Sequence, residues 1–137
     1  MLTINNNEKT IMFNRGDDIN FIYNGYIDDK HEELYKFKKG DKVTFKIYEK
    51  KKYTKGYIFS KDFTITEETI DVEIGLNKNE TIIGDLYNKS KIYYYEIILN
   101  DKYTMCGHDE DGPKKVIIYP SEKEKNNSGK EEWKCHQ

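Results

Sequence analysis

The stretch Lys39–Ile47 reads KGDKVTFKI, in which a Gly-Asp pair precedes strictly alternating polar and apolar residues. The earlier stretch Arg15–Tyr23, RGDDINFIY, repeats this order. Glycine tolerates the positive φ angle of a tight turn, and an aspartate side chain accepts hydrogen bonds from the backbone of its own turn. Alternation with a period of two is typical of a half-buried strand. Each stretch therefore predicts a turn followed by a β-strand with one face on a core.

Similar patterns occur along most of the chain. The predicted strand segments are Thr10–Phe13, Ile19–Ile27, Lys42–Tyr48, Tyr57–Phe59, Asp62–Thr66, Thr69–Leu76, Lys91–Leu99, Tyr103–Cys106 and Val116–Tyr119. We expect the last two to form a hairpin, and we expect Lys91–Leu99, apolar on both faces, to be a central strand covered on both sides. Short strands joined by Gly, Asp and Asn turns predict an all-β fold. The specific expectation is an antiparallel β-sandwich, Ig-like or jelly-roll-like, of about seven or eight strands.

One domain with a tail is predicted. The β-sandwich domain is expected over residues 1–120, and the composition of residues 121–137 predicts a flexible charged tail. Within the domain, Asn77 is expected to cap a polar turn over Asn77–Thr81. The predicted core is the apolar face of the strands: Ile19, Phe21, Val43, Phe45, Ile47, Phe63, Ile65, Ile70, Val72, Ile74 and alternate residues around Tyr95.

Composition and charge argue against nucleic acids and membranes as partners of this protein. The 137 residues include no alanine and a single arginine, and the net charge is −2 with 35% charged residues of both signs. A nucleic-acid-binding protein normally carries a basic stripe, so no nucleic acid partner is expected. No stretch approaches the ~18 apolar residues of a membrane span, so no membrane partner is expected. The N-terminus has neither a basic region nor an apolar core, which predicts synthesis in the cytoplasm without a signal peptide.

The tripeptide Arg15-Gly16-Asp17 matches an integrin-binding motif. The parallel tripeptide Lys39-Gly40-Asp41 stands at the same place before a strand. Since three-residue motifs recur by chance, we interpret both as turns rather than as adhesion sites.

Two thiols and two imidazoles are the candidate metal ligands: Cys106, His108, Cys135 and His136. Four such groups could close a tetrahedral zinc site, but their spacing matches no known zinc motif and two of them lie in the predicted tail. Asp109–Gly112 resembles the start of a calcium loop, but the rest of that loop is absent. A disulfide between Cys106 and Cys135 would require an oxidising compartment. We therefore expect two free cysteines, no metal and no cofactor.

Motifs of common enzymes are absent. The chain contains no nucleophile elbow, no phosphate-binding loop and no zinc-protease helix motif. Its three histidines, His31, His108 and His136, lie in predicted loops or in the tail. We therefore expect a protein that is not an enzyme.

Aromatic residues are the candidate contact residues. Tyr93, Tyr94 and Tyr95 are consecutive, so they cannot all face a core. Exposed tyrosine supplies a large contact area at low entropic cost, which suits protein interfaces and also sugar stacking. The predicted interface residues are Tyr48, Tyr53, Tyr57, Tyr87, Tyr94 and the tail residue Trp133.

Several segments in order carry a resemblance to a known family. After the Gly-Asp strand come Lys61–Ile65 (KDFTI), Leu76–Thr81 (LNKNET), Tyr93–Ile97 (YYYEI) and a closing hairpin. Over about Ile11–Pro120 this order is similar to that of small β-sandwich virion proteins of bacteriophages infecting Gram-positive bacteria, in particular the N-terminal domain of the baseplate upper protein. Gly107–Tyr119 also resembles prophage proteins of clostridia-like hosts.

The resemblance implies a virion structural protein. Because the chain lacks the long receptor-binding region that follows such domains, the expected role is attachment to a tail or baseplate, or decoration of a capsid. The expected partners are other virion proteins. We expect the chain itself to be present in many copies or as a homo-oligomer. One alternative is a carbohydrate-binding module that attaches the virion to cell-wall glycan. The other is a small metal-binding regulator that uses Cys106, His108, Cys135 and His136.

Overall fold

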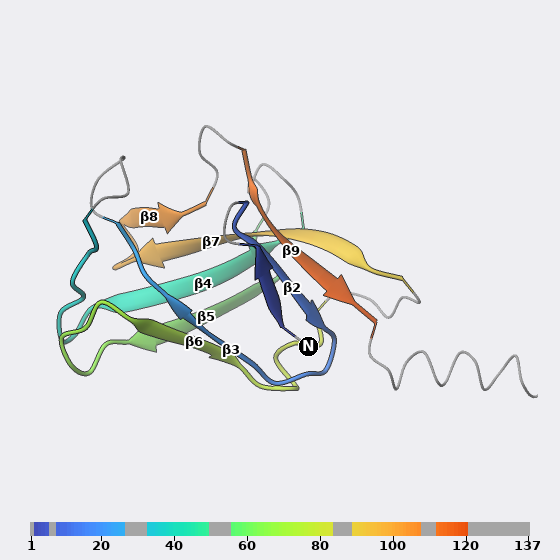
Figure 1. Cartoon of the computed structure of the whole chain (residues 1–137), viewed down its shortest axis with the longest axis horizontal. Helices are drawn as coiled ribbons and strands as arrows, with labels where there is room; N and C mark the ends of the chain where they lie inside the picture. The colour runs from blue at the N-terminus through green and yellow to red at the C-terminus, as the bar shows by residue number, and fades with distance from the viewer. Residues whose placement is uncertain are drawn as a thin grey trace, which may run out of the picture.

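The computed structural model describes residues 2–5, 8–26, 33–49, 56–83, 89–107 and 112–120. This part of the chain contains nine β-strands and no helix (Figure 1), so the predicted all-β class is confirmed. The strands are β1 (Thr3–Asn5), β2 (Thr10–Asn14), β3 (Ile19–Tyr23), β4 (Lys42–Tyr48), β5 (Phe59–Thr64), β6 (Val72–Leu76), β7 (Lys91–Leu99), β8 (Tyr103–Cys106) and β9 (Lys114–Tyr119). The predicted tail, residues 121–137, lies outside the described residues.

The strands form two unequal sheets. The larger has seven strands in the order β1-β2-β9-β7-β4-β5, with β8 also paired to β7, and the smaller pairs β3 with β6. Strands β2 and β9 are parallel, with Ile11 opposite Val116, whereas the other pairs are antiparallel. The prediction of a purely antiparallel sandwich is therefore correct only at the level of the all-β class.

The predicted hairpin between β8 and β9 is wrong, because both strands pair with β7 instead. β9 lies along Lys91–Tyr95 and β8 along Ile97–Leu99, both on the edge of β7 opposite β4. Between β7 and β8 lies a tight turn, closed by a hydrogen bond from the amide of Lys102 to the carbonyl of Leu99 at 3.0 Å. Its two central residues, Asn100 and Asp101, have φ angles of 52° and 59°. Two successive positive φ angles define the type I′ hairpin turn, which asparagine and aspartate favour. The local turn therefore fixes β8 against β7 before the chain reaches β9.

The two Gly-Asp turns predicted from the repeated pattern are confirmed. The amide of Asp17 donates to the carbonyl of Asn14 at 3.2 Å, and the amide of Asp41 donates to the carbonyl of Lys38 at 3.0 Å. Gly16 and Gly40 hold φ angles of 84° and 95°, which the third position of a type II turn requires. Each turn leads directly into a strand of the core.

The core lies between the two sheets. Phe21 of β3 packs edge-on against Phe45 of β4, with 6.1 Å between the ring centroids, and Phe45 contacts Tyr95 of β7 at 5.6 Å. Most of the predicted core residues are buried, and Phe63 is partly buried. Ile70 is 39% exposed, so its placement in the core was wrong. The core also includes buried residues that were not predicted: Ile11, Phe13, Phe37, Leu76, Ile83, Cys106, Val116 and Ile118.

Strand β7 is buried on one face only, so the prediction that both its faces are covered is wrong. Tyr93, Tyr95, Ile97 and Leu99 point into the core, whereas the intervening residues are exposed or half-buried. The reason is that the second sheet, β3 and β6, packs on the core side of the seven-stranded sheet, where Phe21 meets Phe45. This leaves the opposite side, which we call the outer face, without a second layer among the described residues.

Candidate interface surfaces

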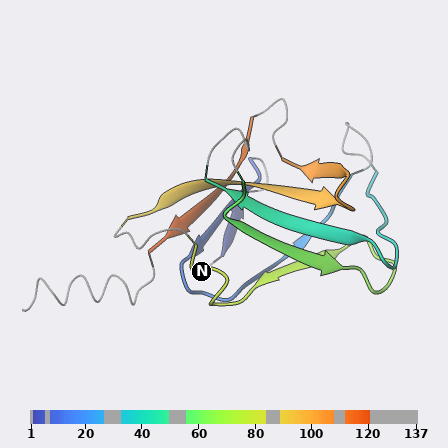
Figure 2. The same cartoon turned by 180° about the vertical axis from the view of Figure 1, so that it is seen from behind.

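The outer face carries a row of apolar side chains at the centre of the large sheet. On β7, every second residue points this way: Ile92, Tyr94, Glu96 and Ile98. The strand register places Ile92 beside Ile117 of β9, which in turn lies beside Met12 of β2. Figure 2 shows that no described strand lies over β4, β5 and β7 on this side. Ile92 is 46% exposed, while Tyr94, Ile98, Ile117 and Met12 are half-buried.

Three of the six predicted interface residues can be placed. Tyr57 is 53% exposed, and the Nζ atom of Lys46 lies 4.9 Å from its ring centroid. Tyr94 is half-buried on the outer face, between Tyr48 on β4 and Lys115 on β9.

Tyr48 does not contribute contact surface as predicted. It is 7% exposed, and its hydroxyl donates to the carboxylate of Glu96. Its burial and this hydrogen bond leave little of Tyr48 available for contact with a partner. The other three predicted interface residues, Tyr53, Tyr87 and Trp133, lie outside the described residues.

Of the four candidate metal ligands, only Cys106 lies in the described residues; His108, Cys135 and His136 do not, and neither does Asp109–Asp111. Cys106 is buried, and its sulfur lies 3.7 Å from the hydroxyl of Tyr95. That hydroxyl donates to the carbonyl of Lys9 at 2.6 Å. No group of three His, Cys, Asp or Glu side chains in the described part of the chain is arranged to hold a metal ion.

A second phenol lies close to the Cys106 thiol. Burial raises the pKa of Tyr23, and the charge of the nearby Cys106 thiolate adds to this increase. Tyr23 therefore stays neutral over the ordinary pH range. The surroundings of Cys106 are those of a packed core thiol.

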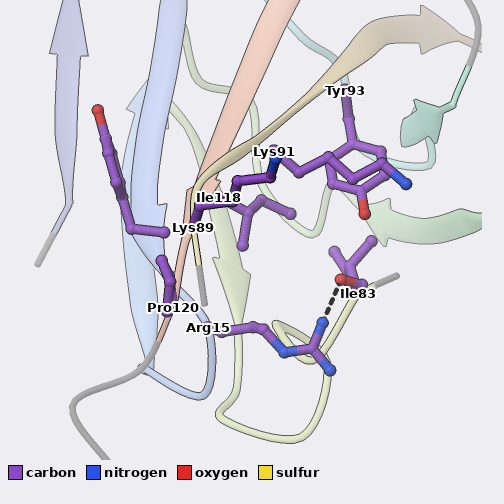
Figure 3. A pocket seen from close by; sticks show the side chains of 8 residues that line it. Arg15, Ile83, Lys89, Lys91, Tyr93, Ile118 and Pro120 are labelled. Atoms are coloured by element: carbon purple, nitrogen blue, oxygen red, sulfur yellow. Dashed lines mark hydrogen bonds between the residues drawn. The ribbon is translucent and has the colours of Figure 1, made fainter. Parts of the chain in front are cut away.

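Arg15 lies inside the protein and is not presented as part of an adhesion motif. It is 5% exposed, and its guanidinium donates to the carbonyl of Ile83 at 2.6 Å (Figure 3). Its backbone amide donates to the carbonyl of Tyr119 at 2.9 Å, which extends the parallel pairing of β2 and β9. Adhesion through this tripeptide would require an accessible arginine, so the interpretation as a turn is confirmed.

The cavity beside Arg15 is small. Its volume is about 10 Å³, and Lys89, Lys91 and Tyr93 also line it. A volume of this size holds about one water molecule. The cavity therefore has no room for a small-molecule substrate or for a phosphate group.

The polar turn predicted at Asn77–Thr81 is confirmed, and it links β5 to the end of β6. The side chain of Asn77 accepts a hydrogen bond from the amide of Glu80 at 3.0 Å, and the Glu80 carboxylate accepts one from the amide of Asn77 at 2.9 Å. The same carboxylate forms an ion pair with Lys61 of β5 at 2.8 Å. This reciprocal arrangement is a capping box, although no helix follows it.

The Glu80 contacts predict a loss of stability in acid. The hydrogen bond from the Lys61 side chain, followed by that from the Asn77 amide, lowers the pKa of Glu80 below the ordinary value of 4.5. A carboxyl group with a lowered folded-state pKa contributes stability above the unfolded value, and this contribution is lost as the pH falls through the folded pKa. Replacing Glu80 by glutamine should therefore reduce the difference in unfolding free energy between pH 7 and pH 3, by about 1 kcal/mol or less.

Urea unfolding followed by circular dichroism at the two pH values measures this difference. Glu67→Gln is the matched control, since Glu67 is exposed and lies outside the Asn77–Thr81 turn. An equal reduction in both variants would contradict the assignment to the Lys61 and Asn77 contacts.

Comparison of the chain with protein-family models, curated proteins and solved structures found no match. Among the described residues no helix has the length and apolar character needed to cross a membrane.

Proposed function

We propose that this protein is a non-enzymatic structural protein of a bacteriophage virion. In this role it docks onto a repeated surface of the particle, either at the tail or baseplate or as a decoration of the capsid. The order of its segments, which is similar to that of small virion proteins, supports the virion role. The outer face supports the docking role.

The row of apolar side chains on the outer face, Met12, Ile117 and Ile92, is the observation that carries the proposal. A central strand usually has both faces covered when both are apolar, yet Ile92 of β7 is 46% exposed. Burying such a face on another protein removes apolar surface from water, which favours association. Many copies on a symmetric particle compensate for a modest affinity at each contact.

Protein quantification in purified particles tests this function. Particles from a producing strain would be separated on a density gradient, and the chain would be measured by mass spectrometry relative to the major capsid protein. We expect a fixed ratio corresponding to several copies per particle, with a phage-encoded replication enzyme as the control that should be absent. Absence of the chain from the particles would overturn the proposal. Binding to purified cell-wall glycan without particle association would instead favour a carbohydrate-binding module.

A further inference from the structure

A groove separates the free edges of β5 and β6. Its volume is about 580 Å³, and it is lined by Asp62–Thr69 and Asp71–Glu73. In Figure 1 β5 and β6 lie next to each other, and residues 65–71 connect them at one end. We call this feature the edge groove. It differs from the outer face because its walls include strand edges.

The β5 wall presents unpaired backbone groups. β5 is the last strand of the large sheet and pairs only with β4 among the described strands. The amide of Ile65 donates to the carbonyl of Asp41 at 2.8 Å, on the β4 side. Because successive residues of a strand direct their backbone groups to opposite sides, the backbone groups of Asp62 and Thr64 point away from β4. They therefore face the groove.

The β6 wall of the groove also presents backbone groups that do not pair with a neighbouring strand. β6 pairs only with β3 among the described strands, and the carbonyl of Gly75 accepts a hydrogen bond from Lys61 Nζ of β5 at 2.8 Å. This carbonyl thus points toward β5, and by the same alternation so do the backbone groups of Glu73. At this end of the groove a lysine side chain already makes the kind of hydrogen bond that an inserted strand would make.

The lining of the edge groove is negatively charged, although Lys61 lies at its Gly75 end, where it pairs with Glu80. Five carboxylate residues line it, and no Lys or Arg does so within the described part of the chain. They are Asp62, Glu67, Glu68, Asp71 and Glu73. The ion pairs found among the described residues involve other carboxylates: Asp101, Glu80 and Glu49. Asp62, Asp71 and Glu73 accept hydrogen bonds from the neutral side chains of Thr44, Asn24 and Asn20, which do not cancel their charge. The groove therefore combines two open strand edges with a net negative charge.

Apolar residues line the inner side of the same groove. Ile65 and Val72 are buried, and Phe63 is partly buried against the core. The carboxylates of Asp62 and Glu73 lie on the opposite side of their strands, because they alternate with these residues. A strand inserted here would meet apolar side chains on one face and carboxylates on the other.

We propose that the edge groove binds an extended basic segment of a partner protein, which adds as a strand between β5 and β6. The backbone of the segment would bond to the two open edges, while its alternate side chains would be apolar and Lys or Arg. The negative groove would favour such a segment over neutral or acidic ones. This inference rests on the proposed docking function and specifies the chemistry of the partner.

Synthetic peptides test the proposal with the full chain. The main probe is a peptide of about ten residues that alternates Lys and Val. Titrated into ¹⁵N-labelled protein, it should shift the amide signals of Asp62, Thr64 and Glu73. Methylating alternate peptide amides, which removes the hydrogen bonds along one edge, should weaken binding by about tenfold or more. The counterpart that alternates Glu and Val should not bind.

Two charge reversals test the role of the groove. Glu68→Lys should weaken binding of the Lys/Val peptide by about fivefold or more, because it places a positive charge in the groove. Glu8→Lys, an equal change at an exposed position outside the groove, should leave affinity within about twofold. Circular dichroism would confirm that both variants are folded.

Two results would overturn the edge groove as a strand site. One is equal binding by a peptide of the same composition with its Lys and Val residues in separate blocks. The other is signal shifts confined to another surface, such as β7. This outcome can be told apart from a failure of the virion role. If the chain is present in particles but does not bind the peptide, only the strand-addition inference is wrong. If the chain binds the peptide but is absent from particles, only the virion role is wrong.

Discussion

Replacing Phe45 by alanine is expected to lower the free energy of unfolding by about 3–5 kcal/mol. Phe45 is fully buried at the centre of β4, and its ring contacts Phe21 of the small sheet and Tyr95 of β7. Its removal would leave a cavity at the point where the two sheets meet, and both sheets would lose packing. A typical domain is stable by about 5–15 kcal/mol, so this loss is a large fraction of the total.

The midpoint of urea unfolding measures this effect, with an unchanged slope indicating that only stability has changed. Tyr103→Ala is the matched aromatic control, since Tyr103 is 63% exposed on β8 and its loss should cost about 0.5 kcal/mol or less. Similar losses in the two variants would mean that Phe45 does not join the two sheets.

The local part of the fold was predictable from the sequence. Period-two alternation located β4 at its observed bounds, Lys42–Tyr48. The apolar run Lys91–Leu99 and the short segment Tyr103–Cys106 likewise match β7 and β8. The Gly-Asp pairs located both turns, since glycine accepts the positive φ angle at Gly16 and Gly40. These features depend on neighbouring residues, whose spacing the sequence records directly.

Strand pairing between distant residues was harder to predict. The parallel pairing of β2 with β9 joins Ile11 to Val116, and no local pattern specifies such a partner. The outer face was missed for a related reason. An apolar face predicts burial, but the sequence does not record that the second sheet among the described residues has two strands and packs on the opposite side. The Asn100-Asp101 turn, by contrast, was a signal that could have placed β8 beside β7.

The candidate surfaces were predicted in part. The consecutive tyrosines correctly indicated that one of them faces outward, and Tyr94 does so. The same reasoning failed for Tyr48, whose hydroxyl is satisfied by Glu96 from the adjacent strand. The edge groove was missed because its carboxylates resemble ordinary solvent-exposed charges in the sequence. Their significance depends on which strands lie at the edges.

Replacing Ile92 by glutamate is expected to abolish incorporation of the chain into particles, with a loss of about a hundredfold or more relative to the unmodified chain. Ile92 is 46% exposed on the outer face, so the change should cost little stability in the free protein. In a docked complex, however, the new carboxylate would be buried against an apolar surface without a partner. Burial of an unpaired charge is strongly unfavourable.

Ile22→Glu is the control, because Ile22 is 56% exposed on β3 and lies on the opposite side of the protein. Co-expression of tagged variant and unmodified chains, followed by quantification in purified particles, compares the two positions directly. Retention of Ile92→Glu with loss of Ile22→Glu would assign docking to the small sheet rather than to the outer face. Loss of Ile92→Glu alone would show that the outer face is the surface that meets the particle, because the two substitutions add the same charge at similarly exposed isoleucines.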